Sequence, residues 1–406
     1  MSRCGCKEQP AHSADDAHPE PRFTVADVLR AGLPVYTQDH RLPAHHWKTL
    51  NAITSCHTPR LGGHLYRCLD CSKERFVPHS CRNRHCPSCQ KKAAVEWLEK
   101  QTASLLPVPY FHVVFTLPHE LNALIAQNQR ALYNLLFSAA SETLLKFGEH
   151  RLKAQIGITA VLHTWSQTLL DHYHLHCIVT GGGLMPGRKG WKSASDRYLF
   201  PVKALAKVFQ AKFRDGLKDL YACGALTFHG QMEALGQSKE FRSLLARAVR
   251  TTWVVYSKKP FAGPRAVLAY LSRYTHRVAI GNGRIRDLDP HARKVTFSHK
   301  DYRDKGRCKK MVLGNAEFTR RFCLHILPER FVKIRHYGLL GNNQRAKKIE
   351  AARLHIGAKQ CAALPEIDDH QTATITQPLA CQHCGSRNMT LVERREPLAA
   401  APLDSS

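Results

Sequence analysis

The feature that most constrains the fold of this chain is a pair of Cys-x-x-Cys turns in its N-terminal quarter. Cys68 and Cys71 form the first turn, and Cys86 and Cys89 form the second. Each turn sets two thiols at the separation of two ligands of a tetrahedral ion, so that two turns close a structural zinc site. The sequence therefore predicts a module that folds around zinc held by Cys68, Cys71, Cys86 and Cys89.

Further side chains around these turns could bind a second zinc ion: Cys56, His64, Cys81 and His85. One more Cys-x-x-Cys turn, from Cys381 to Cys384, has no partner turn nearby in the sequence. Cys361, His370 or another chain could complete a metal site there, and two free thiols are an equally good interpretation. Whether the chain holds one or two zinc ions stays open at this point.

The chain carries a large excess of positive charge. It has 60 Lys and Arg against 32 Asp and Glu, which gives a formal net charge of +28. Such an excess attracts polyanions, and nucleic acid is the leading partner ahead of an anionic membrane. No segment reaches the run of about 18 apolar residues that crosses a bilayer. The first residues lack the apolar core of a signal peptide, so we expect a cytoplasmic protein with reduced thiols.

A second motif is a strand that carries two histidines, within residues 171–183. Side chains alternate between the two faces of a strand, so one face carries His174, His176, Ile178 and Thr180. The opposite face carries Leu175, Cys177 and Val179, and we expect the glycines at 181–183 to end the strand. Two neutral imidazoles on one face can bind a single divalent ion. The alternative is a chance pair, because the chain has 25 His.

A third motif is a predicted helix within residues 263–277, which begins near Pro264. Tyr270 and Tyr274 are four residues apart, so both phenols lie on one helical face. Two core aromatics would show the same spacing. Arg273 and Arg277 on the same segment favour the interpretation that this face meets a phosphodiester.

The histidine strand and the two-tyrosine segment, taken together, resemble the HUH superfamily of single-strand DNA nucleases. More closely, residues 174–184 and 270–280 resemble the two-tyrosine transposases of insertion-sequence family ninety-one. Further similar segments are Phe111–Pro118, Trp253–Tyr256, Lys259–Phe261, Lys333–Leu340 and the cysteine cluster. The resemblance covers the chain from about Phe23 to about Ile349.

The resemblance implies an α+β fold, with an N-terminal zinc-binding module followed by an HUH nuclease domain. Its sheet is expected to be antiparallel, with helices at its flanks and the histidine strand near the centre. The expected divisions are a disordered tail at 1–22, a zinc-binding DNA-binding domain at 23–95, the catalytic domain at 96–349 and a polar tail at 350–406. The absence of a Rossmann glycine pattern and of a P-loop also argues against a nucleotide-binding α/β fold.

The resemblance also implies an activity, which is metal-dependent cleavage and transfer of single-stranded DNA ends in rolling-circle transposition. Tyr270 and Tyr274 would be the nucleophiles that form a covalent phosphotyrosine, and His174 and His176 would bind catalytic Mg²⁺ or Mn²⁺. Gln167 or His276 would supply the third ligand, and the sequence does not choose between them. The expected DNA contacts are Arg273, Arg277, Lys333 and Arg335.

Two other functions fit parts of the pattern. A rolling-circle replication initiator or relaxase would share the nuclease chemistry but act on a plasmid origin. A zinc-dependent DNA-binding protein without catalysis would leave both tyrosines as core residues. The zinc cluster and the block at 333–340 favour the transposase, a DNA-binding enzyme with no membrane partner.

Overall fold

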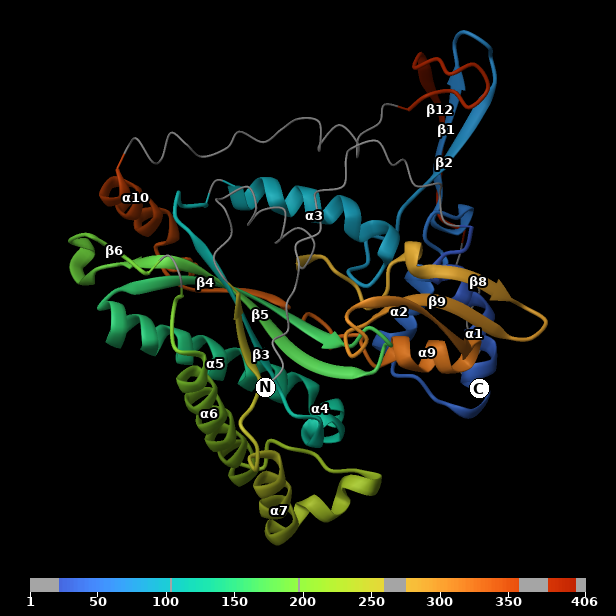
Figure 1. Ribbon diagram of the computed structural model, residues 1–406. Coiled ribbons are helices and arrows are strands. Elements are labelled where there is room, and N and C mark those ends of the chain that lie inside the picture. Colours follow the sequence, from blue (N-terminus) through green and yellow to red (C-terminus); the bar gives the residue numbers. More distant parts are fainter. Residues whose placement is uncertain (1–21, 103, 196–197, 259–274, 358–378, 399–406) are drawn as a thin grey trace.

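The computed structural model describes residues 22–102, 104–195, 198–258, 275–357 and 379–398 (Figure 1). The predicted α+β class with a central antiparallel sheet is confirmed. The described residues form a body around that sheet, a smaller sheet packed on N-terminal helices, and a ribbon that projects from the body. No helix among these residues is long and apolar enough to cross a membrane.

The central sheet has six strands, and the histidine strand lies in its middle. The strand order is β11 (Ile334–Gly338), β4 (Gln155–Trp165), β5 (Asp171–Leu184), β3 (Tyr110–Thr116) and β7 (Val255–Lys258), with β6 (Trp191–Ser193) paired to β5. All of these pairs are antiparallel. β4 and β5 form a long hairpin, which explains why the two strands present their side chains in a fixed register.

One face of this sheet is covered by helices and forms the main core (Figure 1). The helices are α4 (Asn122–Gln127), α5 (Gln129–Phe147), α6 (Val202–Ala222) and α7 (Ser238–Ala248). Leu175, Cys177 and Val179 of β5 pack into this core, as the alternation of the strand predicts. Burial of large side chains such as Phe209 and Phe213 supplies much of the driving force for folding.

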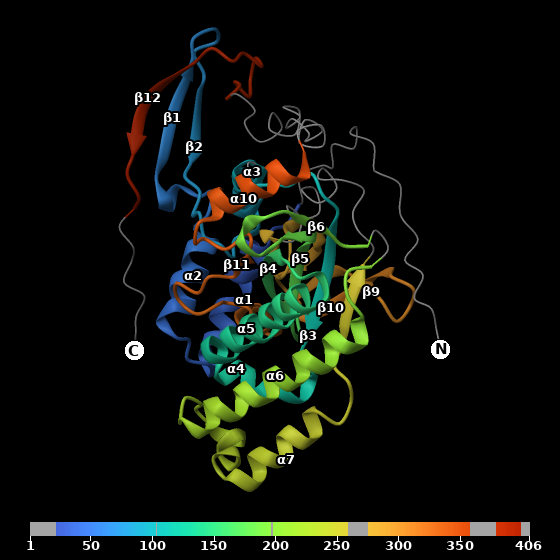
Figure 2. The same ribbon diagram turned by 90° about the vertical axis from the view of Figure 1, so that its left-hand side faces the viewer.

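The opposite face of the sheet is partly covered by α3 (Pro87–Thr102) and α10 (Arg345–Ile356) (Figure 2). A smaller apolar cluster forms beneath these helices and includes Tyr110 and Ile178. The remaining helical turns are η1 (Pro59–Leu61), η2 (His119–Leu121), η3 (Gly148–Leu152), η4 (Pro186–Arg188), η5 (Gly230–Gly236) and η6 (Asn282–Arg284).

The N-terminal helices do not fold as a separate unit with the cysteine module. α1 (Val25–Asp39) and α2 (Ala44–Thr54) share a core with α9 (Asn315–Cys323) and a second antiparallel sheet. That sheet contains β8 (Ile285–Asp289), β9 (Lys294–Asp301) and β10 (Arg307–Gly314). This core therefore joins segments that the sequence analysis assigned to the zinc-binding and catalytic domains.

The projecting ribbon is built from both halves of the chain (Figures 1 and 2). β1 (Gly63–Cys68) pairs with β2 (Glu74–Pro78) on one side and with β12 (Met389–Arg395) on the other. Residues 379–396, expected to be part of a polar tail, thus include the third strand of an N-terminal hairpin.

The glycines at 181–183 do not end the histidine strand, which continues to Leu184. The prediction was wrong because these glycines make room for neighbouring backbone. A Cβ atom at Gly181 would lie 2.7 Å from the carbonyl oxygen of Pro109, and one at Gly183 would lie 2.7 Å from that of Gln155. Without side chains, the strand can pair closely on both sides at this point.

We predict that Gly338→Ala destabilises the chain at the end of β11. Gly338 has a φ of +62°, and an added Cβ would lie 2.1 Å from the carbonyl oxygen of Ile156. Left-handed backbone and the clash together should lower the free energy of unfolding by about 1–3 kcal/mol, measured by denaturant titration. Gly281→Ala is the control because nothing lies within 4 Å of its Cβ position. Equal stability of the two variants would contradict this account.

Candidate functional site

Three histidines come together on the sheet face opposite the main core. His174 and His176 project from β5, and His163 lies directly across from His174 on β4. Their ligand atoms all lie within 4.8 Å of one another. The ring centroids are 5.4 Å apart for His163 and His174, 4.5 Å for His163 and His176, and 4.9 Å for His174 and His176.

Strand alternation and pairing together create this histidine group. Leu162 and Leu175, the neighbours of the histidines on β4 and β5, point into the main core. The adjacent positions therefore point to the opposite face, and cross-strand neighbours in an antiparallel pair are close enough to share a ligand. His174 and His176 thus lie on the same face of β5, as the sequence predicts. His163 of β4 adds a third imidazole to that face.

Hydrogen bonds hold two of the rings in place. Nδ1–H of His174 donates to the backbone carbonyl of His172 at 2.7 Å, which leaves Nε2 to bind an ion. Nδ1 of His176 lies 2.8 Å from Nε2 of His112, which comes from the neighbouring strand β3. Metal-binding histidines commonly use their second nitrogen in this way, because the bond fixes the tautomer and the ring orientation.

Burial keeps the histidines of β5 neutral. Desolvation lowers the pKa of His174 to about 3, and the nearby Arg277 guanidinium contributes to the shift. Desolvation lowers the pKa of His176 well below its usual range, and Arg277 contributes there too. Neutral imidazole is the form that binds metal, so these residues fit a divalent ion at neutral pH.

The third histidine was missed in the sequence. We expected Gln167 or His276 to complete the metal site, but the residue that the structure brings to the pair is His163. The backbone carbonyl of Gln167 accepts a hydrogen bond from Arg284, and the His276 ring lies 5.9 Å from that of Trp97. His163 lies opposite His174 only in the observed pairing register of β4 and β5. The sequence alone did not determine that register.

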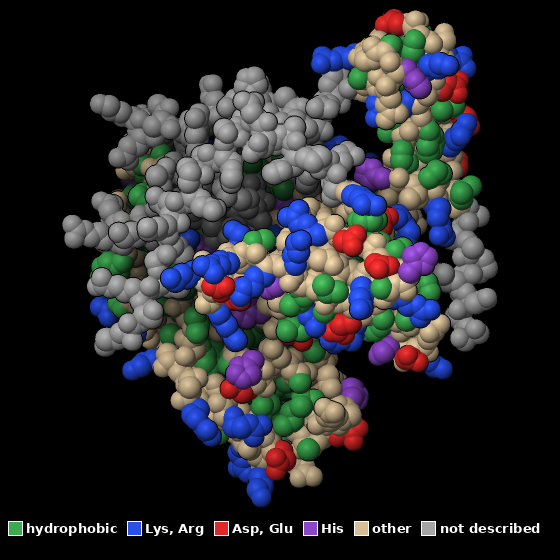
Figure 3. Space-filling model, turned by 45° about the vertical axis from the view of Figure 1, so that its right-hand side comes forward, with side chains coloured by type: hydrophobic (Ala, Val, Ile, Leu, Met, Phe, Trp, Pro, Cys, Tyr) green, Lys and Arg blue, Asp and Glu red, His purple; other side chains and the backbone are tan. Residues whose placement is uncertain are grey.

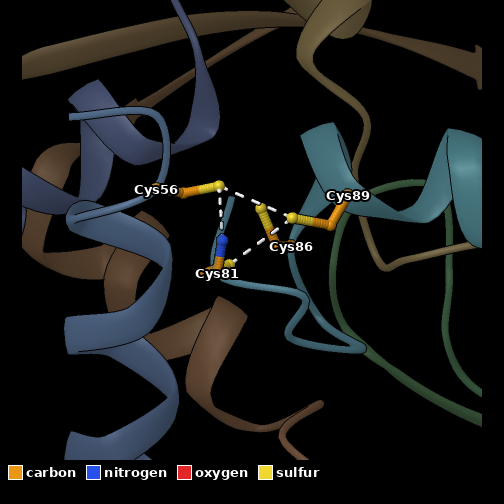
Figure 4. A group of neighbouring side chains, drawn as sticks. All are labelled: Cys56, Cys81, Cys86 and Cys89. Carbon is orange, nitrogen blue, oxygen red and sulfur yellow. Dashed lines mark hydrogen bonds between the residues drawn. The ribbon is translucent and has the colours of Figure 1, made fainter. Parts of the chain in front are cut away.

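Eight of the cysteines that the structure describes form two groups of four, and neither group is the predicted set. Cys56, Cys81, Cys86 and Cys89 make one group (Figure 4). Sγ of Cys89 lies 3.5 Å from Sγ of Cys56 and 3.6 Å from Sγ of Cys81. Zn–S bonds of about 2.3 Å set tetrahedral sulfurs about 3.8 Å apart, so this group fits zinc.

Local structure explains how this first group assembles. Cys56 follows the end of α2, while Cys86 and Cys89 lie at the start of α3, whose N-terminal dipole favours thiolates. The backbone N–H of Cys81 donates to Sγ of Cys56, and that of Asn83 donates to Sγ of Cys81, each at 3.4 Å. The group therefore fastens two helices together at the base of the β1–β2 hairpin.

The second group contains Cys68 and Cys71 together with Cys381 and Cys384. The predicted zinc site that joined Cys68 and Cys71 to Cys86 and Cys89 is therefore wrong. Cys68 and Cys71 lie at the tip of the β1–β2 hairpin, whereas Cys86 lies beyond its base, and six strand residues span about 20 Å.

The histidines suggested as additional zinc ligands belong to neither group. The ring of His64 lies 4.8 Å from that of His79, and Nε2 of His85 accepts a hydrogen bond from the backbone N–H of Leu327. Cys361 and His370 lie outside the described residues.

The predicted nucleophiles Tyr270 and Tyr274, and the predicted DNA contact Arg273, also lie outside the described residues. The described residues on either side of that segment can be placed. Lys258 ends β7 and pairs with His112 of β3, which contacts His176. Arg277 is close enough to lower the pKa of both His174 and His176. Lys258 and Arg277, which are described residues on either side of the segment, therefore both lie near the histidine group.

Two of the predicted DNA contacts, Lys333 and Arg335, also have partners within the protein. Nζ of Lys333 lies 3.4 Å from the carbonyl oxygen of Arg277, and burial lowers the pKa of Lys333 to about 8. Arg335 lies over the rings of Phe137 and Phe331, at 4.2 and 5.0 Å, and donates to the side chain of Asn134. Both cations therefore have partners within the protein, and direct DNA contact by either one stays a prediction.

Comparisons with known proteins agree with this architecture. Residues 28–117 match the family described as "Transposase zinc-binding domain", and residues 157–348 match the family described as "Putative transposase". The chain is 44% identical over 336 residues to "Putative transposase y4qJ" of Sinorhizobium fredii (strain NBRC 101917 / NGR234), which covers 82% of this chain and 84% of that protein.

A second relative and one solved structure are also similar. The chain is 30% identical over 298 residues to "Transposase for insertion sequence element IS801" of Pseudomonas savastanoi pv. phaseolicola, covering 73% of this chain and 70% of that protein. The structure of "Conjugative Relaxase TrwC in complex with mutant OriT Dna" matches 40% of this chain and 71% of its own, with 15% identity and a TM-score of 0.23.

A zinc-binding domain in front of a sheet-based transposase domain defines a class of DNA transposases. Within that class, the chain belongs to the transposases of insertion-sequence family ninety-one, which confirms the resemblance seen in the sequence.

We predict that Cys86→Ser removes one zinc ion and destabilises the junction between α2 and α3. The binding free energy of a four-cysteine zinc site contributes directly to folding, so most of the stabilisation at this junction should be lost. Elemental analysis and thermal unfolding of the full chain measure the two effects. Cys308→Ser is the control, because Cys308 is exposed and belongs to neither group. Unchanged zinc content in Cys86→Ser would refute the assignment.

Proposed function

We propose that this transposase cleaves single-stranded DNA with the help of a divalent ion and rejoins it through a covalent phosphotyrosine, as in rolling-circle transposition. The observation that carries the proposal is the group of His163, His174 and His176 beside Arg277. Neutral imidazoles provide ligands for an ion, and a fixed cation beside them can neutralise the charge of a scissile phosphate.

His163, His174 and His176 would hold the ion. Three protein ligands leave coordination positions open, and the bound ion would act as a Lewis acid on a phosphate oxygen. We expected Mg²⁺ or Mn²⁺ from the family resemblance. Imidazole nitrogens bind transition-metal ions better than Mg²⁺, so of these two ions Mn²⁺ fits the three histidines better.

Tyr270 and Tyr274 are the proposed nucleophiles, on the basis of the family resemblance. In the cleavage step, a phenolate oxygen forms a bond to phosphorus while the bond from phosphorus to the 3′ oxygen breaks. The departing oxygen takes a proton and becomes a free 3′-hydroxyl. A free phenol ionises near pH 10, so cations such as Arg277 would help to favour the phenolate.

Charge supports DNA as the substrate, and the family resemblance is the basis for proposing single-stranded ends of a mobile element. Lys and Arg side chains are spread over the body and the ribbon in the view of Figure 3, consistent with the net charge of +28. A replication initiator or relaxase would share the same chemistry. The match to transposases over most of the chain favours transposition, and the buried neutral histidines favour catalysis over simple DNA binding.

We predict that His163→Ala, His174→Ala and His176→Ala each reduce single-strand cleavage at least about 100-fold while DNA binding persists. Each substitution removes one of three ligands, whereas binding rests mainly on surface cations. Mn²⁺ affinity by calorimetry and cleavage on denaturing gels are the measurements. His325→Ala is the control, since this buried histidine bonds to Leu169 and Thr164 and lies outside the group. If the His163→Ala variant binds Mn²⁺ with normal affinity, His163 is not a ligand of the ion.

We predict that Tyr270→Phe combined with Tyr274→Phe abolishes the covalent protein–DNA adduct. The change removes only two hydroxyls, so the chain should stay folded and still bind single-stranded DNA. Each single variant should retain cleavage but fail in complete transposition, because two phenols can act in successive transfers. Denaturing gels detect the adduct, and mass spectrometry locates the attached nucleotide. A nucleotide attached to any other residue would disprove this mechanism while leaving the metal site possible.

A further inference from the structure

We propose that Cys68, Cys71, Cys381 and Cys384 bind a second zinc ion, which fastens the C-terminal segment to the N-terminal hairpin. The zinc-binding family match ends at residue 117, so it does not include the last two of these cysteines. This site is independent of the histidine group and of the catalytic proposal.

The sulfur positions fit a tetrahedral ion. Sγ of Cys68 lies 3.6 Å from Sγ of Cys384, and Sγ of Cys71 lies 3.5 Å from Sγ of Cys381. All four ligand atoms lie within 4.8 Å of one another. The tetrahedral edge expected for zinc and four thiolates is about 3.8 Å, so a small inward or outward adjustment of each sulfur suffices.

The two Cys-x-x-Cys turns also have matching backbone geometry. In the first turn, the N–H of Ser72 donates to the carbonyl of Cys68 at 2.9 Å, and in the second, the N–H of Gly385 donates to that of Cys381 at 3.0 Å. Ser72 and Gly385 have φ values of +56° and +74°. Left-handed backbone is uncommon for serine, so its occurrence at the equivalent position indicates two copies of one metal-binding turn.

Backbone N–H groups point at the sulfurs of the C-terminal turn. The N–H of His383 donates to Sγ of Cys381 at 3.4 Å. Such bonds stabilise a thiolate, which is the form of cysteine that binds zinc. The turn is thus already arranged for a bound cation.

The surrounding strands are shaped to receive the C-terminal segment. β12 pairs with β1 from Gly63 and Arg395 to Cys68 and Met389. A Cβ atom at Gly62, whose φ is +70°, would lie 2.3 Å from the carbonyl oxygen of Arg395. Glycine at this position therefore allows the C-terminal segment to approach β1. The sequence of the N-terminal hairpin thus accommodates this contact.

Hydrophobic burial is too small to hold this ribbon together. Six of the seven residues of β12 are exposed, and no described apolar cluster includes a residue of β1, β2 or β12. Cys68 and Cys381, by contrast, are 0% and 5% exposed. Small units without a core need a metal or another cross-link, so the ion would supply the missing folding free energy.

The experiment counts zinc in the full-length protein and in a variant with Cys381→Ser and Cys384→Ser. We expect the variant to contain one zinc ion fewer per chain and to be cut faster by trypsin after Arg387 and Arg394. A variant with Cys223→Ser and Cys308→Ser is the control, because both cysteines are exposed and lie outside the two groups. Zinc content equal to that of the wild type would overturn the proposal.

A second measurement needs no variant. Cys384, Cys223 and Cys308 are all exposed, so accessibility alone predicts that an alkylating reagent modifies all three at similar rates. If zinc is bound, Cys384 should stay unmodified in the wild-type protein until a chelator is added, while Cys223 and Cys308 react at once. Alkylation of Cys384 as fast as Cys308 in the untreated protein would refute the site. Neither result depends on DNA cleavage, so failure here is distinct from failure of the catalytic proposal.

Discussion

The strict alternation of side chains along β5 is the constraint on which the rest of the body depends. Leu175, Cys177 and Val179 enter the main core, so His174 and His176 must emerge on the other face. Burial of this apolar face in the core with α5 and α6 stabilises the fold, and the same packing fixes the imidazoles within a rigid sheet. Stability and chemistry are therefore set by the same strand. A one-residue slip in its pairing would remove both.

The ribbon is organised by a different force. Its strands bury little apolar area, and its two groups of four cysteines lie at the base and tip of one hairpin. The base group connects the hairpin to α2 and α3 of the body. The tip group brings in residues more than three hundred positions away in the chain, as the contact of Cys68 with Cys384 shows. Metal binding would thus stabilise the ribbon in place of a hydrophobic core, because its three strands bury too little apolar area to form one.

Much of the site could be predicted from local pattern. The two faces of β5 follow from a period of two, and the cysteine turns are recognisable from their spacing. The missed features all depend on pairing between segments. His163 is recognisable as a ligand only when β4 is set against β5 in register, and the glycines at 181–183 extend the strand because Pro109 and Gln155 pack against them. Lys333 and Arg335 read as free cations until their contacts with Arg277 and Phe137 are seen.

By itself, the sequence determined the class of fold, the excess of positive charge, the histidine pair and the presence of thiolate metal sites. Each of these follows from residue type and spacing along a short stretch of chain. Only the tertiary structure decided which cysteines come together, because the β1–β2 hairpin separates Cys56 from Cys86 and most of the chain separates Cys71 from Cys381. The physical reason is that a ligand set is a set of distances in space, and sequence spacing limits those distances only within one turn or strand.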